Sequence, residues 1–258
     1  MITILQYHEI SESLIFNPNI CPKKMFSKHL DFLHGFRIRD ITLDLRRGNL
    51  DFQSNGCLIT FDDGYKGVLN NAFPLMEKFG YKGLVFLVSG YLNSSSRWDV
   101  PLLSPLPHLS KSDVRYLFEN GWLIGSHSHS HRDLTRLSYK QIKEDITTSK
   151  KVIEDIISAE IIYFSYPFGK LNQQVKDVLK ELGFRFAFKS ASLLRRFDDL
   201  LEISRHSVYI IDFAIKWKFD SFYNGFENIK EVLANKFAYI SPLFQKALNS
   251  GNREPGYN

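Results

Sequence analysis

Two adjacent carboxylates are the first residues of this chain whose types and spacing could do chemistry. Asp62 and Asp63 lie in the segment LITFDDGY, residues 58–65, directly after an apolar run. Neighbouring side chains on an extended chain point in different directions, so the two carboxylates can take different roles. An Asp-Gly turn at the end of a strand explains the same octapeptide without any function. The octapeptide alone does not decide between these interpretations.

A group of histidines provides the second candidate. The segment IGSHSHSH, residues 124–131, carries three imidazoles within five residues. If the segment turns helical, a spacing of four puts His127 and His131 on one face, where they can chelate a divalent ion, while His129 points elsewhere. With one aspartate they make a mixed N and O ligand set. Such a set leaves positions open for water and substrate, which is typical of a catalytic metal site.

The elements that must position these groups follow from the pattern of apolar residues. Short β-rich runs alternate with helical patterns, which predicts βα units around a parallel sheet, as a barrel or a doubly wound sheet. Ligands gather at the C-terminal ends of the strands in either fold. The strands are expected at residues 2–7, 57–62, 83–88, 122–127, 161–166, 184–189 and 207–211. The candidate residues at their C-terminal ends are His8, Asp62, Asp63, His127 and the turn 167–169.

Several helix boundaries are also readable. Ser138 and Gln141 form a capping box, and Asn172 can cap a later helix. Residues 66–79 are helical in period, but Pro74 should kink or split that helix.

The bulk composition predicts an ordinary globular protein. The chain has 258 residues, 44% of them hydrophobic and 24% charged, and we expect one catalytic barrel over residues 1–225 followed by a helix and polar tail over 226–258. The net charge is +5, yet no Lys/Arg run exceeds two residues, so no nucleic-acid partner is expected. No run approaches the roughly 18 apolar residues of a membrane span.

The N-terminal residues lack the basic and apolar segments of a signal peptide. As written, the chain is expected in the cytoplasm, where a small precursor or lipid-linked sugar would be its substrate. A location outside the cytoplasm is expected if a leader was removed.

Three segments together resemble the first three motifs of the polysaccharide deacetylases, the NodB-homology enzymes of carbohydrate esterase family 4. The segments are TFDDGY at 60–65, the pair His127 and His131, and FSYPFG at 164–169. Their order, spacing and strand placement match, and the similarity spans roughly residues 1–211. The resemblance implies an α/β fold with a distorted (β/α)7-type, NodB-like barrel. It also implies a metal-dependent hydrolase that removes N-acetyl groups from an N-acetylhexosamine-containing glycan or glycan precursor.

The resemblance also implies roles for individual residues. Asp62 would be the general base that activates water, and Asp63, His127 and His131 would hold a divalent metal. Zn²⁺ is the first choice, and Co²⁺, Ni²⁺ or Fe²⁺ are compatible with the same ligands. The backbone N–H of Phe168 would help hold the oxyanion. The other residues implied at the substrate and oxyanion side are Tyr166, Pro167 and Gly169.

The general acid is expected to come from the N-terminus. QYHEI at residues 6–10 resembles the opening element of a subgroup related to biofilm poly-N-acetylglucosamine deacetylases, in which this histidine serves as the acid. His8 is therefore the candidate acid, and a buried strand-end histidine is the alternative. The usual late histidine has only His206 as a counterpart after residue 190.

One position departs from the family pattern. The third motif commonly carries an arginine that steadies the catalytic aspartate, and Ser165 stands there. Arg205 or Arg132 could replace it, but the sequence places neither. Trp98 could stack on a sugar ring or simply anchor its own loop.

Two other functions stay open. The missing arginine is compatible with a catalytically silent glycan-binding module on the same barrel. The ligand-and-base set also suits hydrolysis of a non-sugar amide or an ester. The sugar, its attachment, the metal and the oligomeric state are not readable from the sequence.

Overall fold

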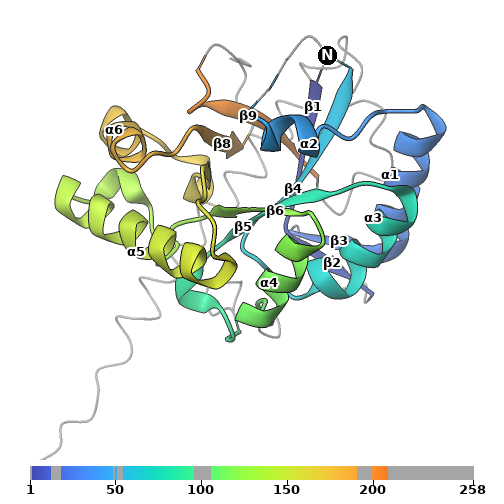
Figure 1. Ribbon diagram of the computed structural model, residues 1–258, viewed down its shortest axis with the longest axis horizontal. Coiled ribbons are helices and arrows are strands. Elements are labelled where there is room, and N and C mark those ends of the chain that lie inside the picture. Colours follow the sequence, from blue (N-terminus) through green and yellow to red (C-terminus); the bar gives the residue numbers. More distant parts are fainter. Residues whose placement is uncertain are drawn as a thin grey trace, which may run out of the picture.

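The computed structural model describes residues 2–12, 19–48, 50, 55–95, 106–190 and 199–208 (Figure 1). Trp98, the predicted domain boundary at residue 225, and the helix and tail expected beyond it lie outside the described residues.

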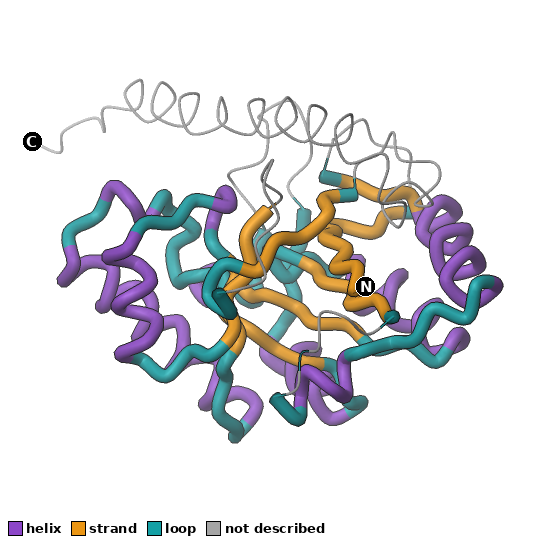
Figure 2. Tube along the Cα trace, turned by 90° about the horizontal axis from the view of Figure 1, so that it is seen from above, coloured by secondary structure: helices purple, strands orange, loops and turns teal. Residues whose placement is uncertain are grey.

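The described strands form a closed, parallel barrel with the order β1-β4-β5-β6-β7-β8-β9. The last strand returns to the first through the pairs Leu5 with His206 and Gln6 with Ser207, and this pairing closes the barrel. Figure 2 shows the strands in the middle of the molecule with helices around them. The expected seven-stranded barrel is confirmed, and a doubly wound sheet is excluded. The barrel strands are β1 (Ile2–Tyr7), β4 (Gly56–Phe61), β5 (Gly83–Leu87), β6 (Leu123–Ser126), β7 (Tyr163–Ser165), β8 (Phe186–Ser190) and β9 (Ile203–Ser207).

Helices cover the outside of this barrel, and a small two-stranded parallel sheet, β2 (Glu9–Ser11) with β3 (Ile20–Pro22), lies beside it. In Figure 1, α5 and α6 lie together on one side, and α1 and α3 on the opposite side. None of the helices in the described part combines the length and hydropathy that a membrane span requires. The helices are α1 (Lys23–Gly35), α2 (Thr42–Arg46), α3 (Phe73–Phe79), α4 (Lys111–Glu119), α5 (Tyr139–Ile157) and α6 (Gln173–Glu181).

The helix boundaries follow the predicted local chemistry. The Ser138–Gln141 capping box begins α5, and the Asn172 side chain accepts a hydrogen bond from the N–H of Val175 at the start of α6. The segment before α3 contains one π-helical stretch, Val68–Ala72. Pro74 lies in the first turn of α3, where its missing N–H leaves no helical hydrogen bond unmade.

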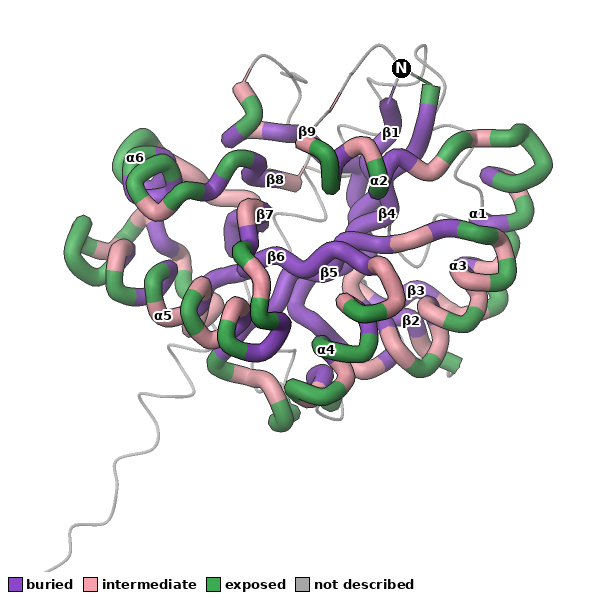
Figure 3. The backbone as a smooth tube through the Cα atoms, in the orientation of Figure 1, coloured by how far each residue is buried: buried purple, intermediate pink, exposed green. Residues whose placement is uncertain are grey.

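The barrel interior changes in character from one end to the other. Alternate residues of a strand face the same side, so each strand presents one set of side chains inward. At the N-terminal ends the inward set is apolar, and it forms one core cluster with Ile41 and Leu45, which cover that end of the barrel. Toward the C-terminal ends the same parity carries polar residues, including Gln6, Thr60 and Arg205. Figure 3 shows these strands buried along most of their length.

The last strand differs from its prediction. It was expected at 207–211 and lies at Ile203–Ser207. The apolar run beginning near Val208 suggested the later start, but the strand instead contains the polar segment ISRHS, which is fully buried. As a result Arg205 belongs to a strand and not to a loop.

Candidate metal centre

The two carboxylates point in different directions because the backbone turns sharply at Asp63 and Gly64, just after the end of β4. Strand β4 ends at Phe61, so Asp62 continues the inward parity of Thr60. Asp63 has φ 68° and Gly64 has φ 70°, two successive left-handed residues. A left-handed conformation is costly for a residue with a Cβ and clusters at functional sites. This turn sends Asp63 toward a different set of partners from Asp62.

The structure brings Asp63, His127 and His131 together. Asp63 Oδ1 lies 3.5 Å from His127 Nε2 and 3.4 Å from His131 Nε2. One ligand atom from each residue falls within 4.8 Å of the other two. The sequence-predicted ligand set is therefore one cluster, with its donor atoms converging on one point.

The cluster fits a divalent cation by its donor chemistry. His127 Nδ1 lies 2.8 Å from the backbone carbonyl of Ser165. A carbonyl only accepts, so Nδ1 carries the proton and Nε2 keeps its lone pair for a ligand. Burial lowers the pKa of both His127 and His131 below the ordinary histidine value. Two neutral imidazoles and one carboxylate are the forms that bind Zn²⁺ or a similar ion.

The histidine segment reaches this geometry without a helix, contrary to the conditional expectation. After β6 the chain is irregular, with left-handed backbone at Ser128 (φ 69°) and His131 (φ 52°). Ser128 Oγ accepts a hydrogen bond from the N–H of His131 at 2.9 Å and closes the turn. His129 does point elsewhere, because its Nδ1 hydrogen-bonds to Ser89 Oγ at 2.9 Å.

Two polar residues on the buried face of α5 hold this segment, and the sequence analysis missed both. Asp145 accepts the N–H of His129 at 2.7 Å and the hydroxyl of Ser130. Ser149 donates to the carbonyl of Ser128 at 3.1 Å. The available signal was two polar side chains four residues apart on the apolar stripe of that helix.

Asp62 lies in a hydrogen-bond network centred on Arg205. The guanidinium donates to both carboxylate oxygens, Nη1 to Oδ1 at 2.8 Å and Nη2 to Oδ2 at 2.7 Å, and both side chains are buried. Arg205 Nη2 also donates to Ser165 Oγ at 2.9 Å, so the guanidinium lies beside the position where the family pattern has its arginine. Arg132 is instead half-exposed and pairs with Asp145.

Gln6 is a further partner of Asp62 that sequence reasoning did not find. Its Nε2 donates to Asp62 Oδ2 at 2.8 Å, and its Oε1 accepts from Ser207 Oγ at 2.8 Å. The second bond fixes the orientation of the amide. Gln6 could have been identified from its spacing of two from Ile4 and four from Ile2, because alternate residues of β1 face the barrel interior.

The charges around Asp62 keep it ionised. Burial alone would raise its pKa, but the charge of Arg205 and its hydrogen bonds to the carboxylate hold that pKa below the ordinary aspartate value. His127 Nε2 lies 4.0 Å from Asp62 Oδ2, so the carboxylate borders the cluster of Asp63, His127 and His131. Ser165 links the two, because its hydroxyl donates to Asp62 Oδ2 at 3.2 Å and its carbonyl accepts from His127 Nδ1.

His8 follows β1 and joins the same region. It is close enough to Asp62 and Arg205 for their charges to act on it. Burial lowers its pKa to about 4, with Asp62 acting in the opposite direction. The imidazole is therefore neutral at pH 7 in the protein without bound ligands.

The third-motif turn lies against the cluster. The ring of Phe168 is 4.8 Å from that of His131, and Phe168 has a left-handed backbone with φ 60°. Pro167 and Gly169 complete the same short 3-10 turn. Tyr166 differs from expectation, because its buried hydroxyl donates to the carbonyl of Leu201 at 2.8 Å and its ring packs in the core. Tyr166 is therefore a core residue next to the turn, with its hydroxyl already engaged.

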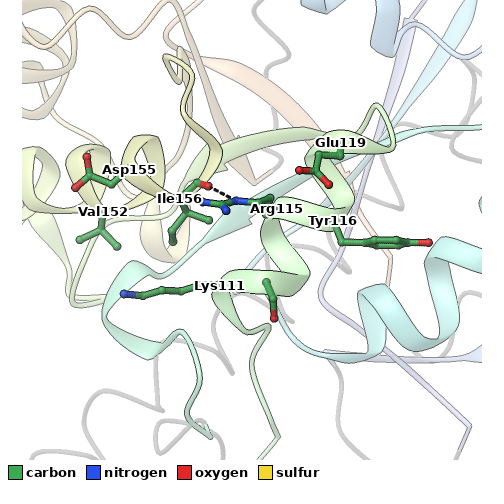
Figure 4. Close-up of a pocket in the computed structure, with 8 residues that line it drawn as sticks. Lys111, Arg115, Tyr116, Glu119, Val152, Asp155 and Ile156 are labelled. Carbon is green, nitrogen blue, oxygen red and sulfur yellow. Dashed lines mark hydrogen bonds between the residues drawn. The ribbon is translucent and has the colours of Figure 1, made fainter.

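A separate surface pocket of about 570 Å³ lies between α4 and α5 (Figure 4). Arg115 Nε donates to the carbonyl of Ile156 across it at 2.9 Å. Its other charged lining residues are Lys111, Glu119 and Asp155, and no predicted site residue lines it.

Comparison with known proteins shows similarity to polysaccharide deacetylases. Residues 51–187 match the family described as polysaccharide deacetylase. The Bacillus subtilis (strain 168) protein YxkH, which carries the name of a polysaccharide deacetylase, is 27% identical over 186 residues, 70% of this chain and 62% of that protein. A poly-beta-1,6-N-acetyl-D-glucosamine N-deacetylase of Staphylococcus aureus (strain MRSA252) is 21% identical over 146 residues, 53% of this chain and 48% of that protein. The chain thus spans between about half and three fifths of the length of these relatives.

Solved structures share the fold. IcaB from Ammonifex degensii superposes with a TM-score of 0.70 at 21% identity, covering 82% of this chain and 93% of that one. The Streptococcus pyogenes deacetylase PplD, solved with acetate, superposes with a TM-score of 0.68 at 19% identity, covering 81% of this chain and 93% of that one. At these identities the likeness establishes the barrel alone.

Proposed function

The chain belongs to the polysaccharide deacetylase family, and from that premise we propose that it is a metal-dependent hydrolase of N-acetyl groups on an N-acetylhexosamine-containing glycan or glycan precursor. One observation carries the proposal. Asp63 converges with His127 and His131, while the adjacent Asp62 borders the cluster in its own buried ion pair. A ligand set beside an ionised base is what hydrolysis of an amide requires.

The protein groups divide the reaction between them. When bound, a divalent ion supplies Lewis-acid chemistry, because it lowers the pKa of water and polarises a carbonyl. Asp62, ionised and fixed by Arg205, accepts the proton of the attacking water. The backbone N–H of Phe168 donates to the oxyanion of the tetrahedral intermediate. Collapse of that intermediate breaks the C–N bond and yields acetate and the free amine.

His8 is assigned to protonation of the leaving amine. A general acid must carry a proton when the C–N bond breaks, and the lowered pKa leaves His8 neutral beforehand. Under this proposal Asp62 passes the proton taken from the attacking water to His8, and the restored Asp62 carboxylate stabilises the imidazolium until His8 gives the proton to the leaving amine.

The silent binding module is the weaker alternative. The reason to consider it was that Ser165 stands where the family pattern has an arginine. The Arg205 guanidinium hydrogen-bonds to Asp62 and to Ser165, so an arginine is present beside Asp62 after all. Hydrolysis of a non-sugar amide or an ester differs only in the substrate, and a substrate panel separates it.

The test combines metal content with acetate release. Protein purified without chelator is expected to hold about one divalent ion, because one three-residue cluster is present in the described part of the chain. Acetate release is then measured on N-acetylglucosamine oligomers, other N-acetylated aminosugars, and lipid-linked and nucleotide-linked sugars. Asp62→Asn is the matched control, which should keep the metal and lose turnover. The double variant His127→Ala, His131→Ala should lose both.

The outcomes separate the candidates. Metal-loaded wild type that releases no acetate from any sugar contradicts the deacetylase. Release from simple amides or esters alone supports the different substrate. Equal glycan binding without turnover in wild type and Asp62→Asn supports the binding module.

A further inference from the structure

A segment distant in sequence lies along the turn that carries the metal ligand. Residues 107–109, just before α4, run antiparallel to residues 63–66, with a bridge between Tyr65 and His108. Leu109 N donates to the carbonyl of Gly64 at 2.8 Å, and Lys66 N donates to the carbonyl of Pro107 at 2.8 Å. These backbone bonds hold the two segments in register.

His108 adds a side-chain bond to this pairing. Its Nδ1 lies 2.9 Å from the backbone carbonyl of Asp63. The ring is buried and is held between two aromatic neighbours, with centroids 4.8 Å from Tyr65 and 5.6 Å from Tyr91. Its own backbone N–H donates to the carbonyl of Ser94 at 2.8 Å. The imidazole is therefore fixed in position from both its backbone and its ring faces.

The hydrogen bond from His108 meets the backbone at a left-handed residue, Asp63. A left-handed conformation costs about 1–2 kcal/mol for a residue with a Cβ, so surrounding contacts must maintain it. The carbonyl of Asp63 lies between the two left-handed residues, and its direction depends on both. A donor that fixes this carbonyl also fixes where the Asp63 side chain leaves the chain.

We propose that His108 is a positioning residue for the metal ligand Asp63. The hydrogen bond from Nδ1–H to the Asp63 carbonyl holds the left-handed turn that directs the carboxylate toward the two histidine ligands. The inference rests on the proposed function, because a positioning role needs a ligand to position. It predicts that His108 acts on metal affinity without contacting the metal or the substrate.

Two variants of equal size isolate the bond. His108→Leu fills similar space and has no donor, whereas His108→Asn offers an amide N–H close to the place of Nδ1. Zn²⁺ affinity is measured by competition with a chromophoric chelator, with circular dichroism and Tm as checks on folding. The Leu variant is expected to bind Zn²⁺ about 10–100-fold more weakly, the usual effect of losing an outer hydrogen bond at a metal site. The Asn variant should stay close to wild type.

A control in the same loop tests whether the effect is general loosening. Ser94→Ala removes the bond from Ser94 Oγ to the carbonyl of Tyr91, 2.7 Å long, without touching Asp63. Its Zn²⁺ affinity should equal that of wild type. Equal affinities in the Leu and Asn variants would overturn the positioning role. Failure of wild type to bind Zn²⁺ would instead overturn the proposed function.

A measurement on the wild-type protein covers the case in which the Leu variant does not fold. A carbonyl can only accept, so the proposal requires His108 to be the Nδ1–H tautomer. ¹⁵N-histidine NMR reports the tautomer of each ring, and the signal lost in His108→Asn identifies His108. An Nδ1-protonated ring supports the proposal, and an Nε2-protonated ring overturns it.

Discussion

Replacing Arg205 by methionine tests whether the charge from the last strand sets the state of Asp62. Methionine keeps the unbranched stem and removes the guanidinium that donates to both carboxylate oxygens. Removing one partner of a buried ion pair typically costs about 3–5 kcal/mol, because the other charge is left without compensation. For a domain of this size that corresponds to a Tm lower by about 6–20 °C.

The loss of stability should depend on pH in a defined direction. In wild type the pKa of Asp62 is held below its unfolded value, so its stabilisation is present above the unfolded pKa and is lost as pH falls through the folded pKa. Without Arg205 the desolvation of Asp62 dominates and raises its pKa, so the carboxyl destabilises the variant most at neutral pH. The gap in Tm between the proteins should therefore narrow toward pH 4. For the same reason the acidic limb of the kcat/KM profile should move to higher pH.

Two further variants isolate the ion pair. The double variant Asp62→Asn, Arg205→Met no longer buries an unpaired charge, so it should be more stable than Arg205→Met alone. Arg132→Met is the matched surface control, since its half-exposed pair with Asp145 should contribute about 0–1 kcal/mol. A Tm loss that is the same at every pH, with an unmoved acidic limb, would refute the reasoning. So would a double variant less stable than the single one.

Three other predictions concern the acid, the histidine turn and the packing beneath the site. His8→Ala should keep its metal and lose about 10²–10⁴-fold in kcat on an N-acetyl sugar. It should hydrolyse a nitrophenyl acetate nearly as well as wild type, because the nitrophenolate leaving group needs no acid. Equal losses of kcat on both substrates would exclude the acid role. Ser128→Ala removes the acceptor of the His131 N–H at a left-handed residue and should weaken Zn²⁺ binding about 10-fold, as read by chelator competition; unchanged affinity would show that the turn holds itself. Gly67→Ala places a Cβ 2.3 Å from a backbone carbonyl oxygen and should lower stability by about 3 kcal/mol in urea unfolding, whereas Gly35→Ala, with nothing within 4 Å, should not.

Much of the scaffold was readable because local rules and tertiary structure agree. Apolar β-rich runs placed the first six barrel strands to within about two residues, the usual uncertainty of element ends. The capping box at Ser138 and the cap at Asn172 are satisfied within a few residues of the chain, so the sequence alone contains both partners. His127 and His131 were identifiable as candidate ligands for a similar reason, since a group of histidines among polar residues is rarely part of an apolar core.

The geometry of the site was less accessible because it depends on backbone conformations that side-chain spacing does not report. His127 and His131 were expected on one face if their segment turned helical, and they meet through an irregular turn with two left-handed residues. That turn is held by Asp145 and Ser149, which come from a helix later in the chain. A spacing of four was compatible with both arrangements, so the sequence placed the two histidines together without indicating the path of the backbone between them.

The sequence did not predict where Arg205 lies, because its strand was expected at 207–211 and lies at Ile203–Ser207. Because side chains alternate along a strand, the residues of β9 that share the parity of Ile203 face the barrel interior. Starting that strand at 207 put Arg205 in a loop, where its direction could not be argued. With the observed start, Arg205 faces inward above Phe86 and Phe188, whose rings lie 5.3 and 6.0 Å from the guanidinium.

The same parity explains how the barrel can do without an arginine in the third motif. Ser165 follows Tyr163 on the inward face of β7, and its short side chain leaves room for a guanidinium reaching across from β9. Asp62 requires a buried cation with two aligned donors, and either strand can supply it, because both end beside the same carboxylate. What matters for Asp62 is therefore where the positive charge lies in the barrel, and not which sequence motif carries the arginine. An arginine missing from one motif consequently says little about activity until the inward positions of the neighbouring strands are known.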